Sequence, residues 1–206
     1  NGYPGGGGAT GQRAQTPGGN GAPFTGGGGG GGAHYNSNNK GGDGGSGIVI
    51  IKRITSSYID DVSEANIIPY EKNYSNTNIE LNYNTTIATS NLLLEPTVTS
   101  FNEYNLLTFT HSGGSEIQTT FSLNIQQNVL CDILIVGGGG GGGNPDGSSQ
   151  EPGGGGAGGV VYMINKTLNA GTYKINVGKG GASNANGNNS SITYLNDSNI
   201  SIDNIL

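Results

Sequence analysis

Alternating apolar and polar residues mark one stretch of the chain clearly. From Ile117 to Ile125, one parity carries isoleucine, threonine, phenylalanine, leucine and isoleucine, with polar residues between them. Leu107 and Phe109 alternate with threonine in the same way. Because successive side chains of a strand point to opposite faces of a sheet, this period of two indicates half-buried strands. Residues 104–136 are therefore predicted to form a β-meander.

Other apolar stretches are continuous rather than alternating. Residues 48–54 read Ile-Val-Ile-Ile-Lys-Arg-Ile, and residues 131–136 read Cys-Asp-Ile-Leu-Ile-Val. β-Branched residues favour strands, so both stretches are predicted strands. Residues 160–177 predict two more strands joined by a turn at Asn169-Ala170-Gly171, and residues 192–195 predict a last one.

Glycine runs adjoin these apolar strands. One run, 137–143, follows Val136 directly, and a second, 153–159, leads into Val160. Residues 1–47 hold further runs, the last of which leads into Ile48. The chain has 42 glycines among 206 residues, far above the usual share of about 7%.

A phosphate-binding loop is one reading of these runs, and it fails on the residues that follow. Residues 133–140 superficially match the strand and glycine fingerprint of dinucleotide-binding proteins. That fingerprint needs a helix whose N-terminus faces the phosphates. Pro145, Pro152 and many glycines follow instead, so no helix can start there.

Disorder and ordered packing are the two remaining readings. Free polyglycine is flexible, but these runs abut apolar segments that favour burial. Polyglycine II is an extended helix with three residues per turn, and its bare backbones pack closely when neighbouring helices pair their amides. We expect a mainly β protein in which small antiparallel sheets flank a bundle of polyglycine II helices, with almost no α-helix.

Composition narrows the possible functions. Hydrophobic residues make up 32% of the chain and charged residues only 11%, so the core is expected to be small. The net charge of −6 disfavours nucleic acid and anionic membranes as partners. No apolar run is long enough for a transmembrane helix. Cys131 is the sole cysteine and reads as a buried packing residue.

Catalytic and metal-binding signals are weak. His34 and His111 read as histidines of surface turns, because no second ligand stands at metal-binding spacing. Asp60, Asp61 and Glu64 read as a solvated acidic loop rather than a calcium site. No nucleophile elbow, HExxH motif or paired-cysteine motif occurs. We therefore expect no enzyme activity, no cofactor and no bound metal.

Two blocks of the chain resemble the glycine-rich domains of phage and large-virus tail-fibre proteins and of some bacterial surface proteins. One block is 131–143 with 153–162 and 168–178, and the other is 41–51. The resemblance implies polyglycine II helices beside a small β-sheet in fibres, adhesins or receptor-binding tips. It also implies a location outside the cell or on a virion surface, and it assigns no ligand.

The order of the two blocks differs from that family. There, the Ile-Leu-Ile-Val-Gly block opens a module and the Gly-Ile-Val-Ile-Ile block closes it, whereas here the closing block comes first. Residues 1–54 are interpreted as the C-terminal half of a module, 55–103 as a linker or small β subdomain, and 104–206 as the N-terminal half of a module. Either the chain is one period of a longer repetitive polypeptide, or one subunit's second half is completed by another subunit's first half.

Both explanations predict a line of units, because a head-to-tail contact that does not close generates a filament. The leading hypothesis is a structural fibre protein whose partner is itself. The glycines expected to pack closely are Gly26, Gly29, Gly32, Gly44, Gly137, Gly140, Gly143, Gly154 and Gly158. The expected assembly strands contain Ile48, Ile50, Ile133, Ile135 and Val160. A Gly140→Ala substitution is expected to clash with a neighbouring helix.

The second hypothesis is an adhesin or receptor-binding tip that recognises cell-surface glycans. Polyglycine bundles present loops between their helices, and loops commonly carry recognition. Tyr3, Phe24, His34 and Tyr35 lie in such predicted loops. Their rings are the candidates for stacking on sugars.

Overall fold

The computed structural model describes most of the chain, in eight separate ranges. The described residues are 17–33, 39–54, 79–80, 97–101, 104–125, 128–145, 152–195 and 201–204. Within them the protein is mainly β, with two small antiparallel sheets and no helix. The prediction of a mainly β protein with small antiparallel sheets is confirmed.

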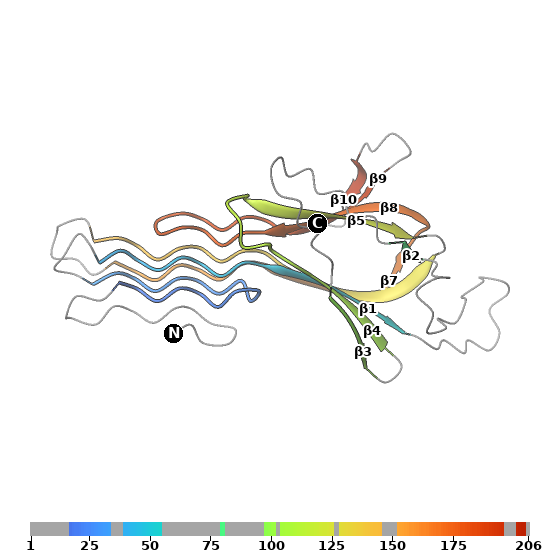
Figure 1. The fold of residues 1–206 in the computed structure, drawn as a ribbon, viewed down its shortest axis with the longest axis horizontal. Helices are drawn as coiled ribbons and strands as arrows, with labels where there is room; N and C mark the ends of the chain where they lie inside the picture. Colours follow the sequence, from blue (N-terminus) through green and yellow to red (C-terminus); the bar gives the residue numbers. More distant parts are fainter. Residues whose placement is uncertain are drawn as a thin grey trace.

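The strands form two layers at one end of the molecule, and glycine-rich segments extend from them toward the other end (Figure 1). Sheet A has the order β3-β4-β1-β6-β7, and sheet B has the order β10-β9-β8-β5-β2. The strands of sheet A are β3 (Thr97–Phe101), β4 (Tyr104–Thr110), β1 (Ile48–Ile54), β6 (Val129–Val136) and β7 (Val160–Leu168). Those of sheet B are β10 (Ser201–Asn204), β9 (Ser191–Leu195), β8 (Gly171–Gly178), β5 (Gln118–Ile125) and β2 (Ile79–Glu80).

Strand β1 is the middle strand of sheet A, although its neighbours come from much later in the chain. Ile50 lies opposite Thr108 of β4 on one side and opposite Leu134 of β6 on the other. The two parts that the sequence divides at 1–54 and 104–206 therefore share one sheet. The described residues of the stretch between them form β2 and β3, each at an edge of a sheet.

The core lies between the two sheets and follows the period of two. Strand β5 buries every second side chain, which places Phe121, Leu123 and Ile125 inside. Phe121 meets Phe109 of sheet A edge to face, with ring centroids 5.2 Å apart. The buried cluster is Val49, Ile51, Leu107, Phe109, Phe121, Leu123, Ile125, Val129, Cys131, Ile133, Ile135, Leu168, Tyr173, Ile175, Val177 and Ile192.

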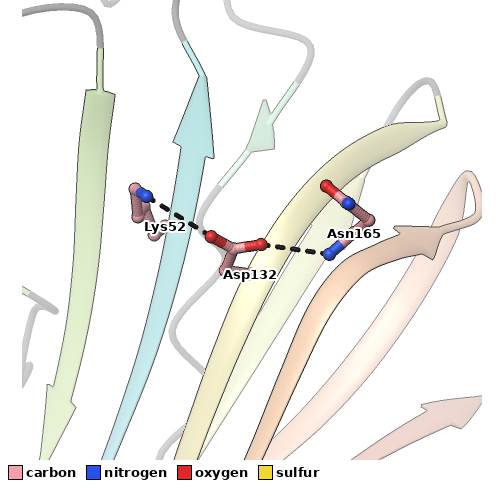
Figure 2. Close-up of polar contacts among 3 residues, drawn as sticks. All are labelled: Lys52, Asp132 and Asn165. Carbon is pink, nitrogen blue, oxygen red and sulfur yellow. Dashed lines mark hydrogen bonds and ion pairs between the residues drawn. The ribbon is translucent and has the colours of Figure 1, made fainter.

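A β-bulge interrupts the pairing of β6 with β7 between Cys131 and Ile133. Figure 2 shows how Asp132 fixes it: one carboxylate oxygen accepts the backbone N–H of Asn165 at 3.0 Å, and the other pairs with the ammonium group of Lys52 at 3.3 Å. Asn165 has a φ of 53°, a conformation that asparagine tolerates better than most residues. The bulge is thus held by contacts that span three strands.

His111 is buried rather than at the surface, so the prediction of a surface histidine is wrong for this residue. Its side chain is only 4% exposed, in the turn between β4 and β5. Nδ1 accepts the N–H of Gly113 at 3.0 Å, and Nε2 lies 3.0 Å from the carbonyl oxygen of Glu116. The neutral ring with its proton on Nε2 satisfies both backbone groups, which explains why the turn encloses it. His34 lies outside the described residues.

The burial of His111 predicts a pH dependence of stability. Burial lowers the pKa of His111 from 6.5, because the charged ring loses hydration, while the hydrogen bond with Glu116 opposes this shift. Below 6.5 the unfolded chain binds this proton more readily than the folded chain does. The free energy of unfolding should therefore fall as pH falls below 6.5, and the full contribution should be present above it.

Urea unfolding between about pH 5.5 and about pH 7.5, where histidines are the side chains expected to titrate, checks this. His111→Gln should be less stable at every pH and should show a smaller slope of stability against pH. Equal slopes in the two proteins would contradict the assignment.

Candidate functional site

The candidate site is a set of glycine-rich segments that run side by side away from the sheets (Figure 1). We call this set the glycine bundle. It consists of residues 17–22, 26–33, 39–47, 137–145, 152–159 and 178–190. Three of these segments are continuous with sheet A, because 39–47 leads into β1, 137–145 leaves β6 and 152–159 leads into β7. We call residues 137–143 the central segment and residues 152–159 the outer segment.

The backbone N–H groups of the central segment donate hydrogen bonds to three neighbouring segments in turn, so every third residue donates to the same neighbour. Three of them donate to the outer segment, two to residues 178–190 and two to residues 39–47. The seven bonds, 2.8 to 2.9 Å from N to O, run from Gly137 to Gly159, Gly138 to Asn188, Gly139 to Gly45, Gly140 to Gly156, Gly141 to Ala185, Gly142 to Gly42 and Gly143 to Gly153. Every amide of this apparently featureless run is therefore paired, and consecutive amides point to three different neighbours.

Carbonyl groups of the central segment accept from further segments. The amides of Gly29 and Gly32 donate to Gly140 and Gly143, so residues 26–33 lie along another side. Gly181 and Asn184 donate to Gly139 and Gly142 at 2.8 and 3.0 Å. A net contribution of about 0.5–1.5 kcal/mol per bond makes the set a substantial stabilising term. Backbone hydrogen bonds thus hold the bundle together where side chains are absent.

Close approach of backbones requires glycine at many bundle positions. A Cβ added at Gly29, Gly32, Gly44 or Gly158 would come within 3.0 Å of a backbone carbonyl oxygen, closer than real Cβ atoms come. Gly26 is equally crowded and also has a φ of +65°. Gly143 and Gly154 are intermediate, with nearest atoms at 3.0 and 3.3 Å, and Gly137 has its nearest atom at 3.7 Å.

The prediction that Gly140→Ala clashes with a neighbouring segment is wrong. A Cβ there would lie 3.6 Å from its nearest atom, the backbone of Gly156, which is ordinary van der Waals contact. Its neighbours Gly139, Gly141 and Gly142 have no such room, because a Cβ on each would meet a carbonyl oxygen within 3.0 Å. Gly137, three residues earlier, has similar room at 3.7 Å, whereas Gly143, three residues later, is tighter at 3.0 Å. Because the residues of the run are identical, the sequence cannot indicate which glycines have room for a side chain.

Side chains of asparagine, aspartate and serine complete the hydrogen bonding where the glycine segments end, and sequence reasoning missed them. The carbonyl oxygen of the Asn144 side chain accepts the N–H of Gly41 at 2.9 Å, and that of Asn184 accepts the N–H of Asn144 at 2.9 Å. Asp43 accepts the N–H of Ser183 at 3.0 Å. The available signal was asparagine or aspartate beside a glycine run, since these residues bond to nearby backbone in turns.

The predicted assembly strands all belong to sheet A. Ile133 and Ile135 are buried in the core, whereas Ile48 and Ile50 lie on the opposite face of the sheet and are half-buried. Val160 begins β7 at the edge of the sheet and is 63% exposed. The structure therefore brings these residues into one sheet, on both of its faces.

One of the four predicted ligand residues is described. Phe24 lies in the turn between residues 17–22 and 26–33, with a φ of 64° and an exposed fraction of 42%. Its N–H donates to the hydroxyl oxygen of Ser46 at 3.1 Å, which fixes the turn against the start of β1. Tyr3, His34 and Tyr35 lie outside the described residues.

The described residues also bear on the predictions for the cysteine, for metal binding and for membrane spans. Cys131 is buried, as predicted, and burial raises the pKa of its thiol to about 12. In the described ranges, no three or more His, Cys, Asp or Glu side chains gather as a group that could hold a metal ion. No helix in the same ranges is long and apolar enough to cross a membrane.

Part of the chain is similar to a known protein family. Residues 115–201 match the model of a glycine-rich domain. The match spans the central and outer segments and strands β5 to β9, and it does not reach β1 or the glycine segments before it. No curated protein and no solved structure matches the chain. The chain is thus similar to a glycine-rich domain over the predicted block at 131–178, and not over the block at 41–51.

Two single substitutions in the central segment test the close approach of backbones. Gly141→Ala would bring a Cβ against the carbonyl oxygen of Ala182, whereas Gly140→Ala, one residue away, has room. We expect Gly141→Ala to lower the melting temperature by about 2–12 °C, from an overpacking cost of about 1–3 kcal/mol. Gly140→Ala should leave it unchanged or slightly higher, because alanine restricts the unfolded chain more than glycine does.

Scanning calorimetry of both variants measures the difference. Gly140→Ala is the matched control, because it makes the same chemical change in the same segment. Equal melting temperatures for the two variants would contradict the crowding at Gly141.

Proposed function

We propose that the glycine bundle is a bundle of polyglycine II helices. The observation that supports this is the rotation of the central amides among three neighbours. A helix with three residues per turn directs every third amide to the same side, whereas a strand alternates between two sides. The open positions of the outer segment, Gly153, Gly156 and Gly159, are also three residues apart.

The function that we propose is structural. The protein forms an extracellular or virion-attached fibre by head-to-tail assembly of glycine-rich modules, and it has neither catalytic activity nor a cofactor. The location and the fibre context rest on the resemblance to glycine-rich tail-fibre and surface proteins. The position of β1 in the centre of sheet A supports the mode of assembly, because both of its neighbours come from the other half of the chain.

Assembly by exchange needs no new contact. In one chain, β1 and residues 26–33 and 39–47 are completed by β4, β6 and the central segment. The same surfaces of two copies can make the same bonds, so exchange of the first part between copies is a low-cost route to association. Residues 55–103 join the two parts, and a segment of this length reaches at most roughly 175 Å. Each copy gives to one neighbour and receives from another, and such a head-to-tail series extends as a filament when the rotation between copies does not close a ring.

Tandem repetition is the other form of the same proposal. In that case successive modules belong to one longer polypeptide, and each closing block completes the module before it. The contacts of β1 with β4 and β6 are the same in both forms.

A disulfide across β1 and β4 tests exchange between copies. Ile50 and Thr108 lie directly opposite each other on neighbouring strands. Cβ atoms of such pairs are about 4.5–5.5 Å apart, which a disulfide can join with a small adjustment. We expect oxidised Ile50→Cys/Thr108→Cys to give a ladder of covalent multimers on a non-reducing gel, and filaments by electron microscopy.

Ser122→Cys/Lys174→Cys is the matched control. These residues are also directly opposite each other, in sheet B, but both come from the second half of the chain. Their disulfide stays within one chain whether or not the first halves are exchanged, so no ladder is expected. Only monomer bands from both pairs, with compact particles at all concentrations, would overturn assembly by exchange.

An adhesin that recognises cell-surface glycans is our second candidate. The observation that favours it is Phe24, an exposed aromatic ring held in a left-handed turn. Backbone strain of this kind clusters at functional sites, and an exposed ring offers a flat apolar surface for a sugar. We expect Phe24→Ala to lose binding to a glycan panel while retaining its melting temperature, measured by calorimetry. Binding that survives in Phe24→Ala would remove this residue from the site.

A further inference from the structure

Sheet A turns an apolar face away from the core. On its edge strand β7, Val160, Tyr162 and Ile164 are 63%, 57% and 63% exposed. They alternate with Val161 and Met163, which pack against the core from the other face of the strand. Three large apolar side chains therefore stand in a row on one strand, toward solvent.

The apolar surface continues onto the neighbouring strands. Leu134 of β6 lies opposite Tyr162, and Ile50 of β1 lies opposite Leu134. Both are half-buried among their neighbours on this face. We call Ile50, Leu134, Val160, Tyr162 and Ile164 the outer patch.

Another strand of the same protein shows what a solvent-facing side normally carries. Strand β5 sends Phe121 and Leu123 into the core and places Thr120, Ser122 and Asn124 on the other face. An antiparallel sheet with one face in water usually has this polar outer face. The outer patch departs from it, and contiguous exposed apolar patches commonly mark interaction sites.

The charges on this face cancel. Its described charged side chains are Lys52 of β1 and Asp132 of β6, which pair with each other at 3.3 Å (Figure 2). The chain as a whole carries a net charge of −6, so two copies repel each other at long range. The outer patch is a surface on which two copies can meet without bringing like charges together.

We propose that the outer patch binds a second copy of this chain, with the two patches packed face to face about a two-fold axis. Homodimer interfaces are more apolar than other protein surfaces, and a two-fold contact uses the same surface on both partners. The outer patch has both properties that this contact needs: it is apolar, and the charged side chains beside it, Lys52 and Asp132, pair with each other.

The available area is of the right order. Three strands about 4.8 Å apart and about eight residues long give a flat footprint of about 400 Å². The outer segment continues from β7 and is open at Gly153, Gly156 and Gly159, where an added Cβ would meet no atom within 4 Å. The outer segment therefore extends the surface. Because side chains protrude from the sheet, the accessible area exceeds the flat footprint and approaches the roughly 800 Å² per partner that is usual in stable complexes.

This contact goes beyond the proposed fibre joint and does not depend on it. Exchange of β1 uses the hydrogen-bonding edges of β4 and β6, whereas the outer patch uses side chains that leave those edges free. A dimer through the outer patch places two molecules, or two fibres, side by side.

Sedimentation velocity over a range of concentrations tests the proposal. We expect the wild-type chain to self-associate, and Tyr162→Thr/Ile164→Thr to weaken this association by about tenfold or more, as loss of central apolar side chains does in other interfaces. Threonine keeps the strand preference, so the melting temperature should change little. Ile117→Thr is the control, because Ile117 is 67% exposed but lies outside sheet A.

Cross-linking separates this contact from the fibre joint. Cys131 is buried with its pKa raised to about 12, so an added cysteine is the reactive thiol of the chain. Tyr162→Cys should give a dimer with a short bis-maleimide, and Ile117→Cys should not. The covalent ladder of the Ile50 and Thr108 pair reports exchange separately.

Three outcomes would overturn the proposal. These are a wild-type chain that stays monomeric at every concentration, a Tyr162→Cys chain that gives no more cross-linked dimer than Ile117→Cys, and equal loss of association in Tyr162→Thr/Ile164→Thr and Ile117→Thr.

Discussion

The pairing of bare backbone with bare backbone is the interaction on which the rest of this molecule depends. Each amide from Gly137 to Gly143 finds a carbonyl on another segment, and consecutive amides turn to different neighbours. Such pairing is possible only where backbones come closer than a Cβ allows, as at Gly141 and Gly142. The glycine segments therefore depend on one another: none could keep its hydrogen bonds in a dry interior if its neighbours were removed. The sheets supply the apolar core that positions these segments, because three of them are direct continuations of β1, β6 and β7.

The sequence predicts the local elements well, because their signals are local. The alternation in β5 and the β-branched runs of β1 and β6 locate these strands to within a few residues. The sequence does not predict that β1 lies between β4 and β6, since that pairing joins residues 50 or more positions apart and leaves no periodic pattern. The burial of His111 was missed for a related reason. Its partners are the backbone groups of Gly113 and Glu116, and these become visible only when the turn is folded.

The glycine bundle marks the limit of prediction more sharply. That the runs are ordered follows from their apolar flanks, but which glycine is crowded does not, because a run of identical residues carries no phase. Gly140 has room and Gly141 has none, and the difference is set by segments 152–159 and 178–190. The asparagine contacts at the ends of the segments were readable in principle, since Asn144 and Asn184 stand beside glycine runs.

The weak dependence of the bundle on apolar burial has a thermal consequence. Unfolding a conventional core exposes hydrocarbon and raises the heat capacity, whereas exposing peptide groups lowers it. The glycine segments bury mainly peptide groups, so their share of the heat-capacity change is small or of opposite sign. We therefore expect the stability curve of this chain to be flatter than that of an ordinary globular domain of equal length, with a smaller loss of stability in the cold. A protein held together by its own peptide groups should stay folded over a wide range of temperature.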